Sequence, residues 1–282
     1  MIFTITMMIN KLAPSVRLPL EFSKGSAAQR QEKAQNFASG LYRNLMTKFT
    51  DNYSIMSYSE LEKHINKLIP DKNYKVIVKE LTPEKAAEFE CNALYQILFN
   101  SSRQAQAHSI DIPGINHTIR SVHLPEVLHE IVHIADNMFN PKLVAREQKI
   151  NLKNMNTKKY EDFYDNHYYC GEIIECKRDK KDALKIIENK TRKFLKGLST
   201  SDKIDYIQDM RYSLMSEINA YKFQVKTAQE LKKSGFMIQD YQFDDISEIG
   251  LYKDKIKLLK NLAIEFIGKE RAKHANKVKK HK

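Results

Sequence analysis

The chain has few of the residues that mark fibrous, disulfide-stapled or membrane-spanning proteins. Its 282 residues include eight glycines and seven prolines, which excludes a collagen-like or low-complexity composition. Three cysteines are too few for a disulfide framework at this length, which fits a reducing compartment or a fold that needs no cross-links. No run approaches the roughly 18 apolar residues of a membrane span. What is present, a composition rich in Lys, Glu, Leu, Ala and Ile, favours a globular and largely helical chain.

The excess of positive charge lies at one end of the chain. The formal net charge is +12, but the segment Leu251–Lys282 alone holds 11 Lys or Arg and three acidic residues. The first 250 residues are therefore nearly neutral, and the excess is mostly a basic C-terminal helix or tail. A charge run of this kind is more often a solvated helix end than a nucleic-acid site, so we do not expect nucleic acid to be the partner.

The first ten residues, MIFTITMMIN, are apolar but lack the basic n-region of a secretory signal peptide. They alternate in strand fashion, so we expect a buried strand there. The corresponding prediction for localisation is the cytoplasm of the producing cell, or secretion without a classical signal peptide.

Hydrophobic periodicity predicts an α+β fold in which helix dominates. The predicted helices cover Ser26–Phe49, Lys85–Phe99 after a Thr82-Pro83 start, a segment beginning near Leu124, Ala183–Leu195, Tyr206–Lys233 and Ile246–Lys273. The predicted strands are Tyr74–Leu81, Ser109–Ile112 and His117–Val122, with a hairpin or a bent loop at Pro113-Gly114. We expect a small twisted sheet over the helix near Leu124, followed by a C-terminal helical subdomain.

The helix near Leu124 carries the pattern His-Glu-x-x-His at residues 129–133. Chance would place this pattern in such a chain about 0.02 times. At 100° per residue, His133 lies about 40° from His129, so both imidazoles project from one face, as shared zinc coordination requires. Glu130 lies near 100°, where it could reach a zinc-bound water without ligating the ion. The opposite face is apolar and is formed by Val127, Ile131, Ile134, Ala135 and Met138. The alternative is a pair of structural histidines.

A zinc site needs a third protein ligand, and the sequence offers a near and a distant candidate. Asp136 shares the histidine face, but it lies ~10.5 Å along the axis from His129, too far for a regular helix to bring both onto one ion. We expect Asp136 to accept a hydrogen bond from His133, and a ligand role for Asp136 is the alternative. Glu217 lies in a helical stretch among apolar and small neighbours, where a carboxylate needs a cation. The alternatives are a Lys or Arg partner for Glu217, and a ligand role for one of Glu147, Glu172 or Glu175.

His-Glu-Ile-Val-His followed by Ser-Glu-Ile-Asn-Ala-Tyr at 216–221 resembles the zincin metallopeptidases, in the gluzincin arrangement of two histidines and a downstream glutamate. The pattern excludes metzincins, because Asp136 and Phe139 stand where that subfamily has Gly and His. It is also similar to the small zinc proteases that bacteria inject into host cells as effectors. Some of those have a ligand Asp where this chain has Asn140, which favours Glu217 here.

The resemblance implies a zinc-dependent endopeptidase with a protein or peptide substrate. His129, His133 and Glu217 would hold Zn²⁺, and Glu130 would act as the general base. The strand at His117–Val122 would receive an extended substrate. Tyr221, on the Glu217 face, is the first choice for stabilising the oxyanion.

We expect residues 1–282 to form one catalytic unit, whose approximate halves are residues 1–140 and 160–282. A second hypothesis is a degenerate zincin or a binding protein without enzymatic activity, which uses the basic C-terminal helix. A hydrolase of another amide bond is a further alternative.

Overall fold

The computed structural model describes residues 27–70, 74–89, 93–99, 105–112, 116–140, 149, 158, 180–239 and 246–280. The described chain is a mostly helical α+β protein with two small sheets, as predicted. It divides into two compact units, each described here by itself. Unit 1 takes the described residues of Met1–Pro141 and Lys222–Phe243, and unit 2 takes those of Lys142–Tyr221 and Asp244–Lys282. The predicted N-terminal strand lies outside the described residues.

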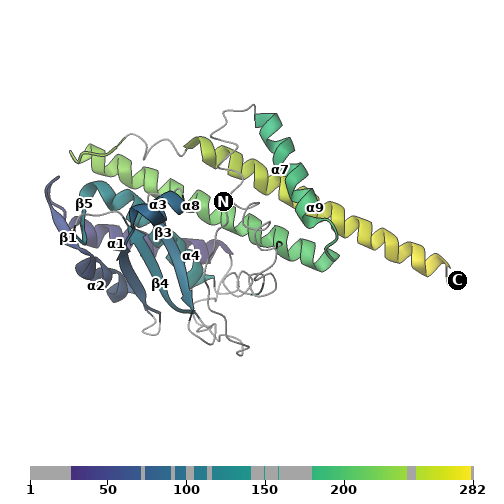
Figure 1. Ribbon diagram of the computed structural model, residues 1–282, viewed down its shortest axis with the longest axis horizontal. Helices are drawn as coiled ribbons and strands as arrows, with labels where there is room; N and C mark the ends of the chain where they lie inside the picture. Colours follow the sequence, from purple (N-terminus) through teal and green to yellow (C-terminus); the bar gives the residue numbers. More distant parts are fainter. Residues whose placement is uncertain are drawn as a thin grey trace. The chain divides into compact units, whose positions relative to one another are not determined.

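Unit 1 contains both sheets (Figure 1). Strand β4 (Ala105–Ile112) is the centre of a three-stranded sheet, with β2 (Val76–Glu80) parallel on one side and β3 (Leu94–Phe99) antiparallel on the other. From residue 107 onward β4 is buried on both faces, as expected of a central strand. The second sheet pairs β1 (Ile55–Ser57) with β5 (Thr118–Arg120).

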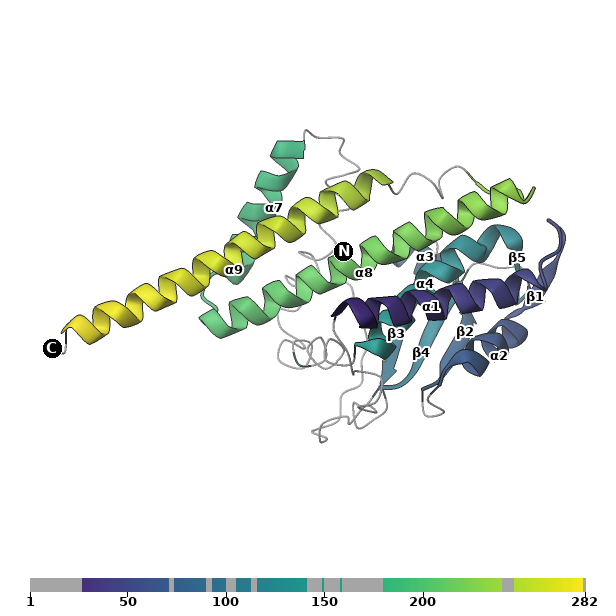
Figure 2. The same cartoon turned by 180° about the vertical axis from the view of Figure 1, so that it is seen from behind.

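Four helices of unit 1 cover or flank these strands. They are α1 (Ala27–Met46), α2 (Tyr58–Leu68), α3 (Pro83–Phe89) and α4 (Leu124–Phe139). Helix α4 packs against β3 and β4, and α1 packs against both α4 and α2 (Figure 2). Helix α1 buries a stripe at helical spacing, Ala34, Ala38, Leu41 and Leu45. Helix α4 thus lies between the sheet and α1, with little of its surface exposed.

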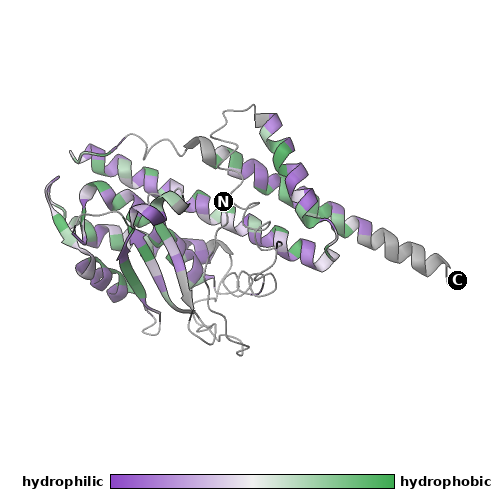
Figure 3. Cartoon of the chain, in the orientation of Figure 1, coloured by the Kyte–Doolittle hydropathy of each residue, from purple (hydrophilic) through white to green (hydrophobic). Residues whose placement is uncertain are grey.

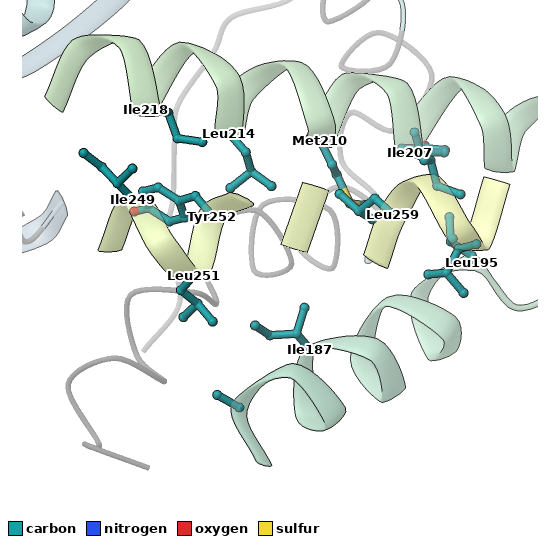
Figure 4. Packing of buried hydrophobic residues seen from close by; sticks show 13 residues of the cluster. Ile187, Leu195, Ile207, Met210, Leu214, Ile218, Ile249, Leu251, Tyr252 and Leu259 are labelled. Atoms are coloured by element: carbon teal, nitrogen blue, oxygen red, sulfur yellow. The ribbon is translucent and has the colours of Figure 1, made fainter. Parts of the chain in front are cut away.

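Unit 2 is built from α7 (Lys180–Leu195), α9 (Ile246–Lys280) and the N-terminal part of α8 (Thr200–Lys233). These helices converge on a buried apolar cluster (Figure 4). Helix α8 contributes to it at a spacing of three or four residues, through Ile207, Met210, Leu214 and Ile218. Hydrophobic and hydrophilic residues alternate along α8 (Figure 3). Since the boundary between the units falls within α8, this one helix belongs to both.

Helix α8 ends in a Schellman motif. Gly235 has a φ of +86°, a conformation that costs glycine little. The amide of Phe236 donates to the carbonyl of Leu231 at 3.0 Å, and the amide of Gly235 donates to that of Lys232 at 3.1 Å. Asn52 then accepts from the Met237 amide at 2.7 Å, which ties the end of α8 to the loop before β1.

One local prediction was wrong. The predicted helix Lys85–Phe99 ends as α3 at Phe89, and Leu94–Phe99 is instead strand β3. A short apolar run has no decisive period, and here pairing with β4 determines its conformation. Of the two alternatives predicted at Pro113-Gly114, the hairpin is excluded, because β4 and β5 belong to different sheets.

Candidate metal centre

The first turn of helix α4 contains Pro125 and the acidic Glu126. Proline is tolerated there, and a negative charge interacts favourably with the positive end of the helix dipole. A turn of 3-10 helix, Ser121–His123, leads into it from β5. Most of its residues are buried, and Ile131 is fully so. The predicted apolar back is therefore buried as expected, and the packing holds the histidine-bearing helix in place.

His129 and His133 direct the same ring nitrogen toward one another. Their Nε2 atoms lie 3.1 Å apart, and the ring planes meet at 69°. Two nitrogens bound at about 2.0–2.1 Å to one tetrahedral zinc would lie roughly 3.3 Å apart. The separation is therefore close to that required for shared coordination.

Glu217, on α8, completes a group that could hold a metal ion. One ligand atom from each of His129, His133 and Glu217 lies within 4.8 Å of the others. His129 is buried, while His133 and Glu217 are half-buried. Two imidazole nitrogens and one carboxylate oxygen are a donor set that zinc uses in catalytic sites, where the fourth position stays open for water. The structure thus brings the three predicted ligands together.

Glu130 and Asp136 are both buried on α4. Each takes part in further polar or electrostatic interactions. A carboxylate removed from water requires such compensation. Their predicted roles, general base and second-shell acceptor, stay predictions.

Tyr221, the predicted oxyanion stabiliser, is half-buried beside the apolar cluster of unit 2. Its ring stacks on that of Tyr252, with centroids 6.2 Å apart and an interplanar angle of 25°. Such a contact is typical of aromatic packing. A catalytic role for Tyr221 stays a prediction.

His123 lies just before α4, where its Nδ1 accepts from the Arg120 amide at 3.3 Å, and burial lowers its pKa. Glu147, Glu172 and Glu175 lie outside the described residues.

The sequence pattern did not indicate Tyr95, which contacts His133, or His108, which contacts Tyr95. Tyr95 lies on β3 and stacks on His133, with ring centroids 6.3 Å apart and planes at 16°. Its hydroxyl lies 2.6 Å from Nδ1 of His108, a buried residue on β4. Leu94–Phe99 was predicted as helix, and only its pairing as strand β3 with β4 brings Tyr95 near His108.

Comparison with known proteins adds no relative: the chain matches no protein-family model, no curated protein and no solved structure. Among the described residues, no helix has the length and apolar character needed to cross a membrane.

Proposed function

We propose that this protein is a zinc-dependent endopeptidase. The observation that supports it best is the convergence of His129, His133 and Glu217 within 4.8 Å around an HExxH helix. The same helix supplies Glu130, a buried carboxylate next to a ligand in sequence. This donor set is that of a hydrolytic zinc site with one open position.

In the proposed mechanism each residue of this chain has a separate task. His129, His133 and Glu217 hold Zn²⁺, which when bound lowers the pKa of a water molecule to about 7 and polarises the scissile carbonyl. Glu130 takes a proton from the attacking water and delivers it to the leaving amine. Asp136 orients His133, and Tyr221 donates a hydrogen bond to the developing oxyanion.

The substrate we propose is a protein or peptide. Action as a bacterial effector on a host protein rests on the resemblance of the motif alone. The proposal treats the chain as a single catalytic unit, in which α8 connects Glu217 to unit 1.

The experiment compares wild-type protein with Glu130→Gln on a proteome-derived peptide library, with new amino termini identified by mass spectrometry. Glu130→Gln should lower the cleavage rate by about 10²–10⁴-fold, because the general base is lost, while zinc stays bound. Glu126→Gln is the matched control, since Glu126 is equally buried and lies one turn earlier on α4.

Equal cleavage by wild type and Glu130→Gln would contradict the proposed base. Zinc-loaded wild-type protein that produces no new amino termini would contradict the peptidase assignment itself. If Glu126→Gln and Glu130→Gln both abolish cleavage, the loss comes from disturbing α4 and not from removing a general base.

A second candidate function is binding to an anionic polymer through the C-terminal helix. Helix α9 continues as far as Lys280 and so carries the basic segment as ordered helix. Removing the whole of 251–282 would damage unit 2, because Leu251, Leu259 and Leu262 are buried in its cluster. The test is therefore replacement of the Lys and Arg residues after 270 by Gln, with binding to a short DNA duplex measured against salt. Salt-dependent binding that the replacement removes would support it, and equal binding would contradict it.

A further inference from the structure

Four aromatic rings of unit 1 follow one another from the sheet to the histidine pair. Tyr74, just before β2, stacks on His108 with centroids 4.0 Å apart and planes at 17°. His108 is nearly parallel to Tyr95, at 5.6 Å and 5°, and Tyr95 stacks on His133 at 6.3 Å and 16°. The contacts of Tyr95 with His108 and His133 fall within the range of about 4.5–7 Å between centroids that is typical of favourable aromatic pairs. We call these four residues the aromatic column.

The hydroxyl of Tyr95 is fixed from two elements. Asn137 on α4 donates its Nδ2 to the Tyr95 oxygen at 2.9 Å. The Tyr95 oxygen also lies 2.6 Å from Nδ1 of His108 on β4, and the Tyr74 hydroxyl lies 3.3 Å from the same nitrogen. Burial lowers the pKa of His108 to about 3, so its ring is neutral near pH 7 and offers one nitrogen as an acceptor. Tyr95 is therefore held by both the sheet and α4.

Asn137 lies one helical turn after His133 on α4. Tyr95 therefore contacts α4 at two neighbouring positions, His133 through its ring and Asn137 through its hydroxyl. The Tyr95 ring lies nearly parallel to the His133 imidazole, and the Tyr95 oxygen accepts a hydrogen bond from Asn137. Metal affinity depends strongly on such residues, because a ligand that is already oriented loses less freedom on binding.

We propose that Tyr95 is a positioning residue, which sets the plane of the His133 ring for metal binding while His108 and Asn137 hold the Tyr95 hydroxyl. The inference rests on the metal site of the proposed function, and it assigns Tyr95 no contact with the substrate. It adds a residue from the sheet to a site otherwise built on helices.

The test measures zinc affinity by competition with a chromophoric chelator and records the visible spectrum of the Co²⁺-loaded protein. Tyr95→Leu removes the ring and should weaken zinc binding by roughly 10–100-fold, the range typical of residues that support a ligand. It should also change the Co²⁺ bands, because the His133 ring can rotate. Tyr95→Phe keeps the ring but loses the hydroxyl that Asn137 and His108 contact, so both signals should lie between those of wild type and Tyr95→Leu. Tyr53→Leu is the control, since Tyr53 is 84% exposed in the same unit.

A purely structural role would lower the melting temperature of the metal-free Tyr95→Leu protein but leave its zinc affinity and Co²⁺ spectrum unchanged, which would overturn the proposal. If Tyr95→Leu does not fold, Asn137→Ala takes its place, because it frees the hydroxyl on the α4 side. Unchanged zinc affinity and an unchanged spectrum in that variant would equally overturn it. Wild-type protein that binds no zinc would instead contradict the proposed function.

Discussion

The two units bury different kinds of side chain. In unit 1, α4 alone buries four titratable groups, Glu126, His129, Glu130 and Asp136. In unit 2, the described core is an apolar cluster of α7, α8 and α9, with Asp209 and Lys255 as its buried charged residues. Burying a titratable group costs free energy unless partners compensate, so groups of this kind concentrate where chemistry needs them. Unit 1 thus buries most of its titratable groups on α4, whereas the core of unit 2 is mostly apolar and packs the N-terminal part of α8, which carries Glu217.

The largest effects expected on stability come from the two cores. Ile131→Ala on α4 and Leu259→Ala on α9 each remove a fully buried side chain. Each should lower the free energy of unfolding by about 2–5 kcal/mol, measured by urea denaturation. Only Ile131→Ala should also weaken zinc binding, because its helix carries both histidines.

Ile264→Ala is the matched control on α9, since Ile264 is 61% exposed. It should change the free energy of unfolding by less than about 0.5 kcal/mol. Equal losses for Leu259→Ala and Ile264→Ala would refute the described packing of unit 2.

His108 makes the stability of unit 1 depend on pH. Burial lowers its pKa from 6.5 to about 3, so between these values the unfolded chain binds more protons than the folded one. The stability of unit 1 is therefore intact above pH 6.5 and falls as the pH decreases toward 3, by at most about 1.4 kcal/mol per pH unit from this group. Urea denaturation from pH 7 to pH 3 should show a shallower decline for His108→Gln than for wild type. Parallel declines would contradict this contribution.

The smallest expected effect belongs to an ion pair of unit 2. Arg192 on α7 donates two hydrogen bonds to Glu265 on α9, at 3.2 and 2.7 Å. These bonds, with one from Lys269, lower the pKa of Glu265 to about 2. The depressed pKa means that the pair stabilises above pH 4.5 and is lost as the pH falls toward 2.

Both side chains of this pair are partly exposed, so Glu265→Gln should cost no more than about 1 kcal/mol at pH 7 and less at high salt. Thermal denaturation at two salt concentrations measures it. A loss that is independent of salt would contradict an electrostatic origin.

The sequence was sufficient for the features that depend on local spacing. Helix α4, its apolar back and the shared face of His129 and His133 follow from the helical period alone. Glu217 was predicted because a carboxylate among apolar neighbours needs a cation, and the structure brings it to the histidines.

Features that depend on pairing between distant segments were not accessible. Leu94–Phe99 is a short apolar run that suits a helix or a buried strand equally, and β4 decides between them. The role proposed for Tyr95 therefore could not be inferred, since it requires the register in which Tyr95 lies opposite Ile110 and Ile97 opposite His108.

Zinc content per chain, in wild type beside Glu217→Ala, tests the central claim most directly. Glu230→Ala is the matched control, because Glu230 is also half-buried on α8 but lies outside the ligand group. We expect about one zinc per chain in wild type and in Glu230→Ala. In Glu217→Ala, affinity should fall by more than the roughly 100-fold typical of residues that only support a ligand. Stoichiometric zinc of unchanged affinity in Glu217→Ala would remove Glu217 from the site and contradict the account.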